Sequence, residues 1–176
     1  MTQCYFDIET TGLDPENPKI CSIQYQRLST ESGSLAEDLV ILKEWEHSER
    51  NLIIEFDKLF SSIWDFVPVG QNLLFDFNFL NDKKKKYLGK KYGSPFFLGK
   101  PFIDLKSILI LKNHGLFKVY NQSIGKTGDG AKVPEWYNQG DYQRIDDYIR
   151  REAKNFIEAY MVLKEELPKI LLPAEK

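Results

Sequence analysis

Residues 4–12 decide the fold, and they read CYFDIETTG. Apolar and polar side chains alternate as far as Glu9, which predicts a β-strand, and the step Thr10-Thr11-Gly12 predicts the loop that follows it. Asp7 and Glu9 therefore lie on the same face of the strand, about 6.6 Å apart along it. Two like charges at this spacing repel unless a cation lies between them, and ligands that offer only oxygen suit Mg²⁺ or Mn²⁺. The alternative is that this edge of the strand simply faces water.

Strand and helix signals follow one another along the rest of the chain. Further strands are predicted over residues 20–28, 39–45, 66–70 and 102–105, with a turn over residues 29–33. Helices are predicted from the N-cap Ser48 through Ile63 and over residues 75–88, 105–113 and 142–167, the last stopped by Pro168. Residues 90–101 are predicted as loop, and residues 121–140 as irregular or as short helices. Three early strands that can form a meander, followed by alternating strands and helices, favour the α/β class, with a mixed central β-sheet flanked by α-helices.

The composition is that of a single globular domain over residues 1–176, with 42% hydrophobic and 28% charged residues. No apolar run approaches the roughly 18 residues that a membrane span needs. The N-terminus also lacks the basic flank and apolar core of a signal sequence. We therefore expect a cytoplasmic protein that binds no membrane. Cys4 and Cys21 lie in strand-like segments, which favours two buried, reduced thiols over a disulfide.

Two further carboxylates lie in apolar surroundings. Asp76 follows the strand over residues 66–70, and it could cap the next helix or direct its carboxylate into a cleft. Glu152 falls inside the apolar stripe of the last helix, one turn after Tyr148. Burying a carboxylate without a partner is costly, so Glu152 needs a metal ion or an arginine such as Arg27. Two rivals for its role precede it in the same helix, Asp146 and Asp147.

A run of lysines follows the helix that carries Asp76. It consists of Lys83, Lys84, Lys85 and Lys86, with Lys90 and Lys91 shortly after. The net charge of -2 gives no overall indication of nucleic-acid binding, so the run is a local feature. It is either a solvated helix end or a surface that attracts a phosphate backbone beside the cleft of Asp76.

Three segments together resemble known sequence motifs. Residues 6–14, FDIETTGLD, closely match the first motif of the DEDD superfamily of 3′–5′ exonucleases. Residues 70–80, GQNLLFDFNFL, resemble the second motif, as found in the proofreading domains of family B DNA polymerases. Residues 148–152, YIRRE, resemble the third motif of the tyrosine subgroup, with Glu152 where the family has aspartate. The histidine subgroup matches less well, because the two histidines, His47 and His114, lie outside the last helix.

The resemblance implies a ribonuclease H-like fold and a stand-alone, metal-dependent 3′–5′ exonuclease. Its expected substrate is single-stranded DNA or a frayed 3′ end, and its expected chemistry is a two-metal-ion mechanism. Tyr148 would help to position the attacking water. The ligands of two Mg²⁺ or Mn²⁺ ions would be Asp7, Glu9, Asp76 and Glu152. The residues against the last two nucleotides would be Thr10, Thr11, Leu13 and Asn72.

Two other functions stay open from the sequence. The same chemistry could act on RNA, since this fold does not fix the sugar of the substrate. A catalytically silent module that binds nucleic acid is the other alternative, and the glutamate at position 152 motivates it. In each case the partner is single-stranded DNA or RNA.

Overall fold

The sheet that the sequence predicts forms the centre of the protein. The computed structural model describes residues 2–13, 17–29, 36–62, 65–112 and 129–171. Its strands are β1 (Gln3–Thr10), β2 (Ile20–Leu28), β3 (Val40–Lys43), β4 (Val67–Gly70) and β5 (Ile103–Asp104). They form one sheet in the order β3-β2-β1-β4-β5, with antiparallel pairs β1–β2 and β2–β3 and parallel pairs β1–β4 and β4–β5. The predicted mixed sheet is confirmed, and β1 lies at its middle.

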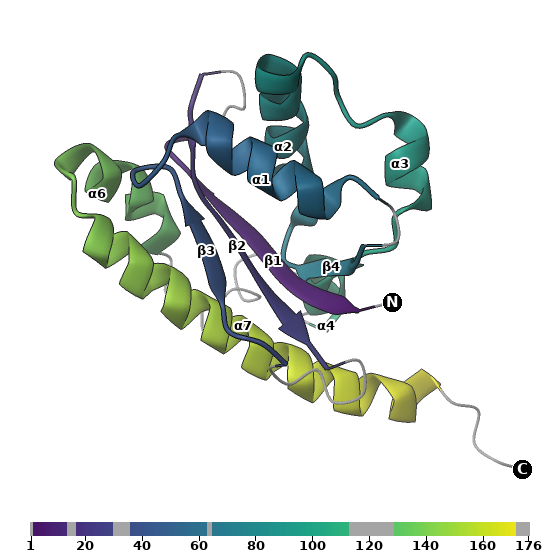
Figure 1. Ribbon diagram of the computed structural model, residues 1–176. Coiled ribbons are helices and arrows are strands. Elements are labelled where there is room, and N and C mark those ends of the chain that lie inside the picture. The colour runs from purple at the N-terminus through teal and green to yellow at the C-terminus, as the bar shows by residue number, and fades with distance from the viewer. Residues whose placement is uncertain (1, 14–16, 30–35, 63–64, 113–128, 172–176) are drawn as a thin grey trace, which may run out of the picture.

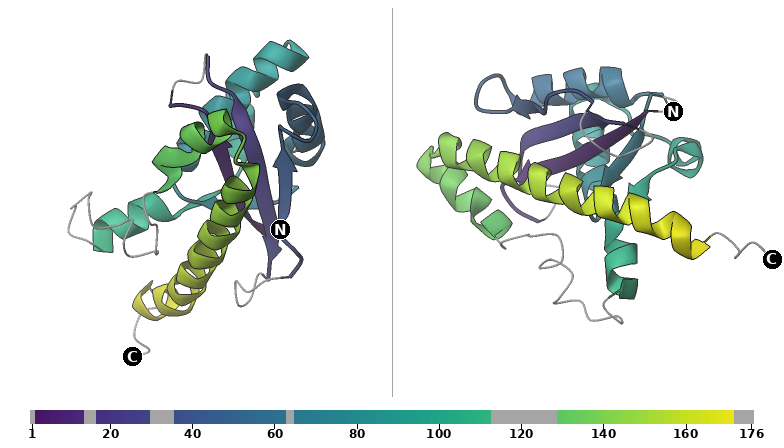
Figure 2. Two further views of the ribbon diagram at one scale, coloured as in Figure 1. Left: turned by 90° about the vertical axis from the view of Figure 1, so that its left-hand side faces the viewer. Right: turned by 90° about the horizontal axis from the view of Figure 1, so that it is seen from below.

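Helices cover both faces of this sheet. They are α1 (Glu49–Phe60), α2 (Leu73–Leu88), α3 (Ser94–Gly99), α4 (Leu105–Lys112), the 3₁₀ turn η1 (Asp129–Lys132), α6 (Val133–Gln139) and α7 (Tyr142–Leu171). Figure 1 and the two views of Figure 2 show α1 on one face and the long helix α7 crossing the opposite face. The predicted flanking helices are therefore confirmed.

The alternation along β1 assigns its residues to the two faces. Cys4, Phe6 and Ile8 are buried in the core cluster formed with α1 and α2. Tyr5 faces the other way and packs against Phe156 of α7, with ring centroids 5.1 Å apart. Because side chains in a strand alternate between the faces, Asp7 and Glu9 continue the Tyr5 face and lie on the α7 side of the sheet.

Several element bounds differ from the prediction. The helix α2 begins two residues earlier than expected, because the Asp104 carboxylate accepts hydrogen bonds from the Asn72 and Leu73 N–H groups, at 2.8 and 3.0 Å. The segment predicted as loop contains α3, and β3 ends at Lys43 where residues 44–46 turn. The prediction that Pro168 stops the last helix is wrong, since α7 continues to Leu171. A proline in the last turn removes a single hydrogen bond, which a helix of 30 residues tolerates.

Two other local predictions, the cap of α1 and the buried free thiols, are confirmed. The Ser48 hydroxyl caps α1 by accepting a hydrogen bond from the Asn51 N–H at 3.2 Å. Both cysteines are buried free thiols, and burial raises the pKa of Cys4 to about 12. Within the described ranges no helix is long and apolar enough to cross a membrane. The turn predicted over residues 29–33 and residues 121–128 lie outside the described residues, apart from Ser29.

Candidate active site

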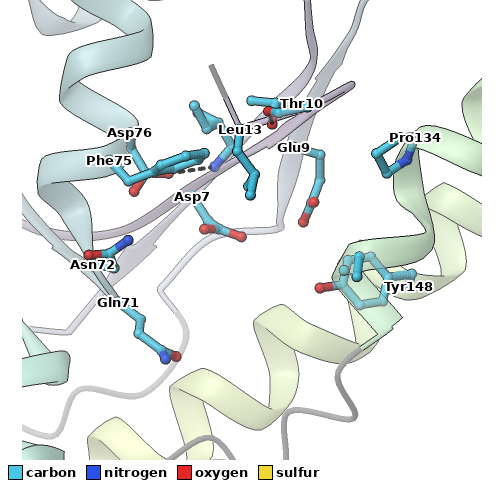
Figure 3. A pocket seen from close by; sticks show the side chains of 14 residues that line it. Asp7, Glu9, Thr10, Leu13, Gln71, Asn72, Phe75, Asp76, Pro134 and Tyr148 are labelled. Atoms are coloured by element: carbon cyan, nitrogen blue, oxygen red, sulfur yellow. Dashed lines mark hydrogen bonds between the residues drawn. The ribbon is translucent and has the colours of Figure 1, made fainter. Parts of the chain in front are cut away.

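A cavity of about 390 Å³ opens at the carboxyl end of β1. Its walls come from β1 and the loop after it, from the start of α2, and from η1, α6 and α7. Figure 3 shows the Asp7 and Glu9 carboxylates directed into the space between β1 and Tyr148. The residues that line it are Asp7, Ile8, Glu9, Thr10, Gly12, Leu13, Gln71, Asn72, Phe75, Asp76, Gly130, Ala131, Pro134 and Tyr148.

The structure brings Asp7 and Glu9 together as the strand alternation predicts. Both line the cavity from the same face of β1. The Gln24 amide on the neighbouring strand β2 donates a hydrogen bond to Asp7 Oδ2 at 3.0 Å, which orients that carboxylate. The alternative, that this edge faces open water, is wrong for Glu9, since it is buried.

Asp76 reaches the same cavity from α2. It is only 2% exposed, and its Oδ1 accepts a hydrogen bond from the Ile8 N–H at 3.1 Å. The parallel pairing of β1 with β4 ends at Tyr5 and Val69, so this carboxylate takes over a backbone donor beyond the last sheet pair. Asp76 lies in the first turn of the helix, and the N-cap is Asn72, with a left-handed φ of 64°. The alternative role of Asp76 as a helix cap is therefore wrong.

Tyr148 closes the cavity from α7. It is buried, its ring meets Trp136 edge-on at 6.0 Å between centroids, and Figure 3 shows its hydroxyl on the side of the two β1 carboxylates. Burial raises the pKa of Tyr148, and the charges of Glu9 and Glu152 raise it further. The phenol is therefore a hydrogen-bond donor at neutral pH.

Glu152 lies one helical turn after Tyr148 and is 3% exposed, as its place in the apolar stripe predicts. It is not among the described residues that line the cavity, although its charge acts on both Tyr148 and Tyr5. Its rival Asp146 forms ion pairs with Lys43 and Arg150, at 2.9 and 2.6 Å, and accepts a hydrogen bond from Arg150 Nε. The other rival, Asp147, is exposed on the outer side of the helix. Arg27, the proposed alternative partner, pairs instead with Glu37 at 3.5 Å.

The residue types that line the cavity suit a hard divalent cation, whereas the distances between their carboxylates do not yet form a metal site. Among the described side chains no group of three or more His, Cys, Asp or Glu is arranged to hold a metal ion. The donors offered by the cavity are nonetheless the carboxylates of Asp7, Glu9 and Asp76. Carboxylate oxygens are the ligands that Mg²⁺ and Mn²⁺ prefer, so the residue types fit such ions.

The residues expected to contact nucleic acid divide into two groups. Thr10, Leu13 and Asn72 line the cavity, and Leu13 is 84% exposed at its rim. The Thr11 hydroxyl accepts a hydrogen bond from the Lys19 N–H at 2.8 Å, so Thr11 contributes to the loop itself.

The lysine run does not form one phosphate-binding surface. Lys83 is 1% exposed, donates a hydrogen bond to the Pro18 carbonyl, and lies 3.6 Å from Glu49. Lys84 is 5% exposed and forms an ion pair with Asp57. The prediction of nucleic-acid contacts is therefore wrong for these two residues, because carboxylates of α1 hold them in the interior. Lys85 and Lys86 are exposed, and neither lines the cavity.

Sequence reasoning missed one wall of the cavity. Gly130, Ala131 and Pro134 of η1 and α6 lie opposite the β1 carboxylates, in a region predicted as irregular or as short helices but not as part of the site. Phe75 also lines the cavity, and its place next to Asp76 in the second motif was a signal that could have found it. Trp136 is buried in the core beside Tyr148.

Comparisons with solved structures identify the fold. A crystal structure of E. coli exonuclease I with single-stranded DNA, in its zinc-bound form, matches 96% of this chain with a TM-score of 0.66 and 12% identity. An exonuclease I structure in complex with an inhibitor matches 63% of the chain with a TM-score of 0.52 and 13% identity. The chain spans 42% and 30% of the length of these two proteins. No family model matches the sequence. No curated protein matches it significantly either.

The ribonuclease H-like fold expected from the sequence is confirmed by this likeness. The likeness to exonuclease I extends over 96% of the chain that carries this mixed sheet of five strands and its flanking helices. At 12% identity the likeness concerns the fold.

Proposed function

We propose that this protein is a metal-dependent 3′–5′ exonuclease of the DEDD superfamily that hydrolyses single-stranded DNA or frayed 3′ ends. The observation that carries the proposal is the convergence of Asp7, Glu9 and Asp76 on one cavity beside Tyr148. These residues come from separate elements, β1, α2 and α7, and each is the residue that the motif resemblance assigns to the chemistry. The likeness in fold to exonuclease I, in a complex with single-stranded DNA, supports the same activity.

The carboxylates would hold two Mg²⁺ or Mn²⁺ ions, with Glu152 as the fourth acidic residue. When bound, such ions lower the pKa of a coordinated water and stabilise the oxygen that leaves the phosphodiester. Asp7 is oriented for this role by Gln24, and Asp76 by the Ile8 N–H. These hydrogen bonds fix the direction of both carboxylates before substrate arrives, which reduces the reorganisation that the reaction needs.

Tyr148 would orient the attacking water. Its phenol stays protonated, so it donates a hydrogen bond and does not remove the proton itself. The proton of the attacking water must therefore pass to a carboxylate or to solvent. We therefore propose that the protein belongs to the tyrosine subgroup and not to the histidine subgroup.

The walls of the cavity would bind the end of the strand. The exposed Leu13 side chain and the Phe75 ring offer apolar surfaces against which a terminal base can stack. Thr10 and Asn72 add polar groups at the same rim. DNA is proposed from the likeness in fold, and RNA is tested beside it.

The test is digestion of 5′-labelled single-stranded DNA and RNA in Mg²⁺, in Mn²⁺ and in EDTA, beside an Asp7→Asn variant. We expect a ladder that shortens from the 3′ end, depends on the metal and is lost in the variant. Equal or faster loss of RNA would replace DNA as the substrate. Absence of cleavage in both metals, with binding intact, would establish a silent nucleic-acid-binding module.

A further inference from the structure

The cavity is acidic, and its substrate would be a polyanion. Among the described residues that line it, Asp7, Glu9 and Asp76 are acidic and none is basic. Lys83 and Lys84 are held in ion pairs within the protein. A strand whose phosphates enter this cavity therefore needs a cationic group from another part of the structure.

Lys106, in the first turn of α4, places a positive charge directly behind the rim. Its ammonium donates a hydrogen bond to Asn72 Oδ1 at 2.6 Å, and Asn72 lines the cavity. Lys106 is partly exposed, so its side chain is not sealed in the interior. Neither the motifs nor the lysine run pointed to this residue, which lies 34 positions from Asn72 along the chain.

The hydrogen bond determines which end of the Asn72 carboxamide faces the substrate. A lysine ammonium has donors only, so it must meet the amide oxygen. The amide nitrogen then turns the other way, and Figure 3 shows it on the side of Asp7. Asn72 therefore presents two N–H donors toward the cavity, with a cation immediately behind them.

The backbone around Asn72 is fixed and its donors are already used. The Asp104 carboxylate accepts hydrogen bonds from the N–H groups of Asn72, Leu73 and Lys106, at 2.8, 3.0 and 2.9 Å. The N–H groups of Asn72 and Leu73 are thus taken by a carboxylate of the protein, so an anion contact here falls to side chains. The same carboxylate anchors both partners of the Lys106–Asn72 hydrogen bond.

We propose that Lys106 and the Asn72 carboxamide together bind a backbone phosphate of the substrate strand, next to the phosphate that is cleaved. Donors combined with a cation favour an anionic acceptor over a neutral base edge. Asn72 precedes Asp76 by one helical turn, which places the contact beside the carboxylates and not among them. The inference rests on the proposed function for the identity of the ligand. It makes Lys106 a binding and positioning residue.

The experiment measures binding without cleavage. Fluorescence anisotropy of a 5′-labelled oligothymidylate of 12 nucleotides, in EDTA, gives the affinity over a range of salt concentrations. We expect Lys106→Met to weaken binding about tenfold and to lower the slope of log K on log salt by about 0.7. Lys106→Arg should bind like the wild type. The control Lys154→Met removes a lysine of α7 whose side chain is 75% exposed. It should change neither the affinity nor the salt slope.

Two further arms separate a phosphate contact from a structural effect. Asn72→Gly keeps the left-handed backbone and removes the carboxamide, so it should weaken binding with an unchanged melting temperature. A single neutral methylphosphonate, moved along the last three linkages, should abolish the difference between wild type and Lys106→Met at one position. A salt slope of Lys106→Met equal to that of Lys154→Met would overturn the inference. Binding in EDTA together with no cleavage after addition of Mg²⁺ or Mn²⁺ would refute the exonuclease and leave the phosphate contact standing. Absence of binding by the wild type would overturn both.

Discussion

Gly130→Ala tests whether the Tyr148 hydroxyl is held where the proposed chemistry needs it. A Cβ atom at position 130 would lie 2.8 Å from Tyr148 Oη and 3.6 Å from Cζ. Gly130 is not among the described glycines with positive φ, so alanine is compatible with its backbone. The substitution therefore acts through this one contact.

The size of the effect follows from the geometry. Ordinary van der Waals contact begins at 3.4 Å, so the hydroxyl must retreat by roughly 0.6 Å. The ring cannot simply slide, because Trp136 packs edge-on against it and the Arg151 guanidinium lies 5.8 Å from its centroid. A misplacement approaching 1 Å at a reacting group lowers a rate by up to about 100-fold, so we expect kcat to fall on the order of 10-fold to 100-fold. KM should change little.

A double-mutant cycle with Tyr148→Phe is the decisive assay. Without the hydroxyl the nearest ring atom is 3.6 Å from the new methyl group, which is ordinary contact. Adding Gly130→Ala to Tyr148→Phe should therefore cost little further activity on a 5′-labelled single strand in Mg²⁺. If Gly130→Ala lowers kcat by the same factor in both backgrounds, the two residues are not coupled and the reasoning is refuted.

Three further outcomes are expected. Lys83→Ala should lower the free energy of unfolding by about 3 kcal/mol, because it leaves Glu49 buried without its closest cation. The control Lys85→Ala removes an exposed lysine and should change that free energy by less than about 0.5 kcal/mol. Urea denaturation measures both variants. Burial lowers the pKa of Lys100 to about 8. The folded state therefore binds fewer protons than the unfolded state between pH 8 and 10.5. The free energy of unfolding of the wild type, relative to that of Lys100→Met, should rise over that interval by up to about 3 kcal/mol. A flat difference from pH 7 to 10.5 would contradict this. Asp76→Asn keeps an oxygen for the same backbone N–H, so it should retain the melting temperature while cleavage falls on the order of 100-fold or more.

The local periodicity of the sequence predicted the face or the burial of a side chain wherever a single strand or helix determines it. The alternation of residues 4–9 placed Asp7 and Glu9 on one face, and the helical stripe placed Glu152 among buried residues; the structure agrees on both. These predictions succeed because the period of a strand or helix is set by the backbone alone. The order of elements follows for the same reason.

Two of the failures involve partners that are distant in sequence. Lys83 and Lys84 look like a solvated run until α1 supplies carboxylates from 27 or more positions earlier. The true start of α2 depends on Asp104, which lies 32 positions after Asn72. Composition and periodicity describe neighbours along the chain, so a contact made by tertiary packing overrides them without leaving a local signal.

The cavity itself is a consequence of the β1 alternation. On the α7 side of the sheet there are two separate apolar clusters. One surrounds Tyr5 and includes Ala153 and Phe156, and the other surrounds Trp136 and includes Ile145 and Ile149. Helix α7 is anchored at both clusters, while between them the strand presents acidic side chains in place of apolar ones. An apolar face cannot close over carboxylates, because desolvating them is costly. The two acidic side chains at apolar positions of β1 thus leave a gap under the helix and also line it, which is why the site lies at the end of β1.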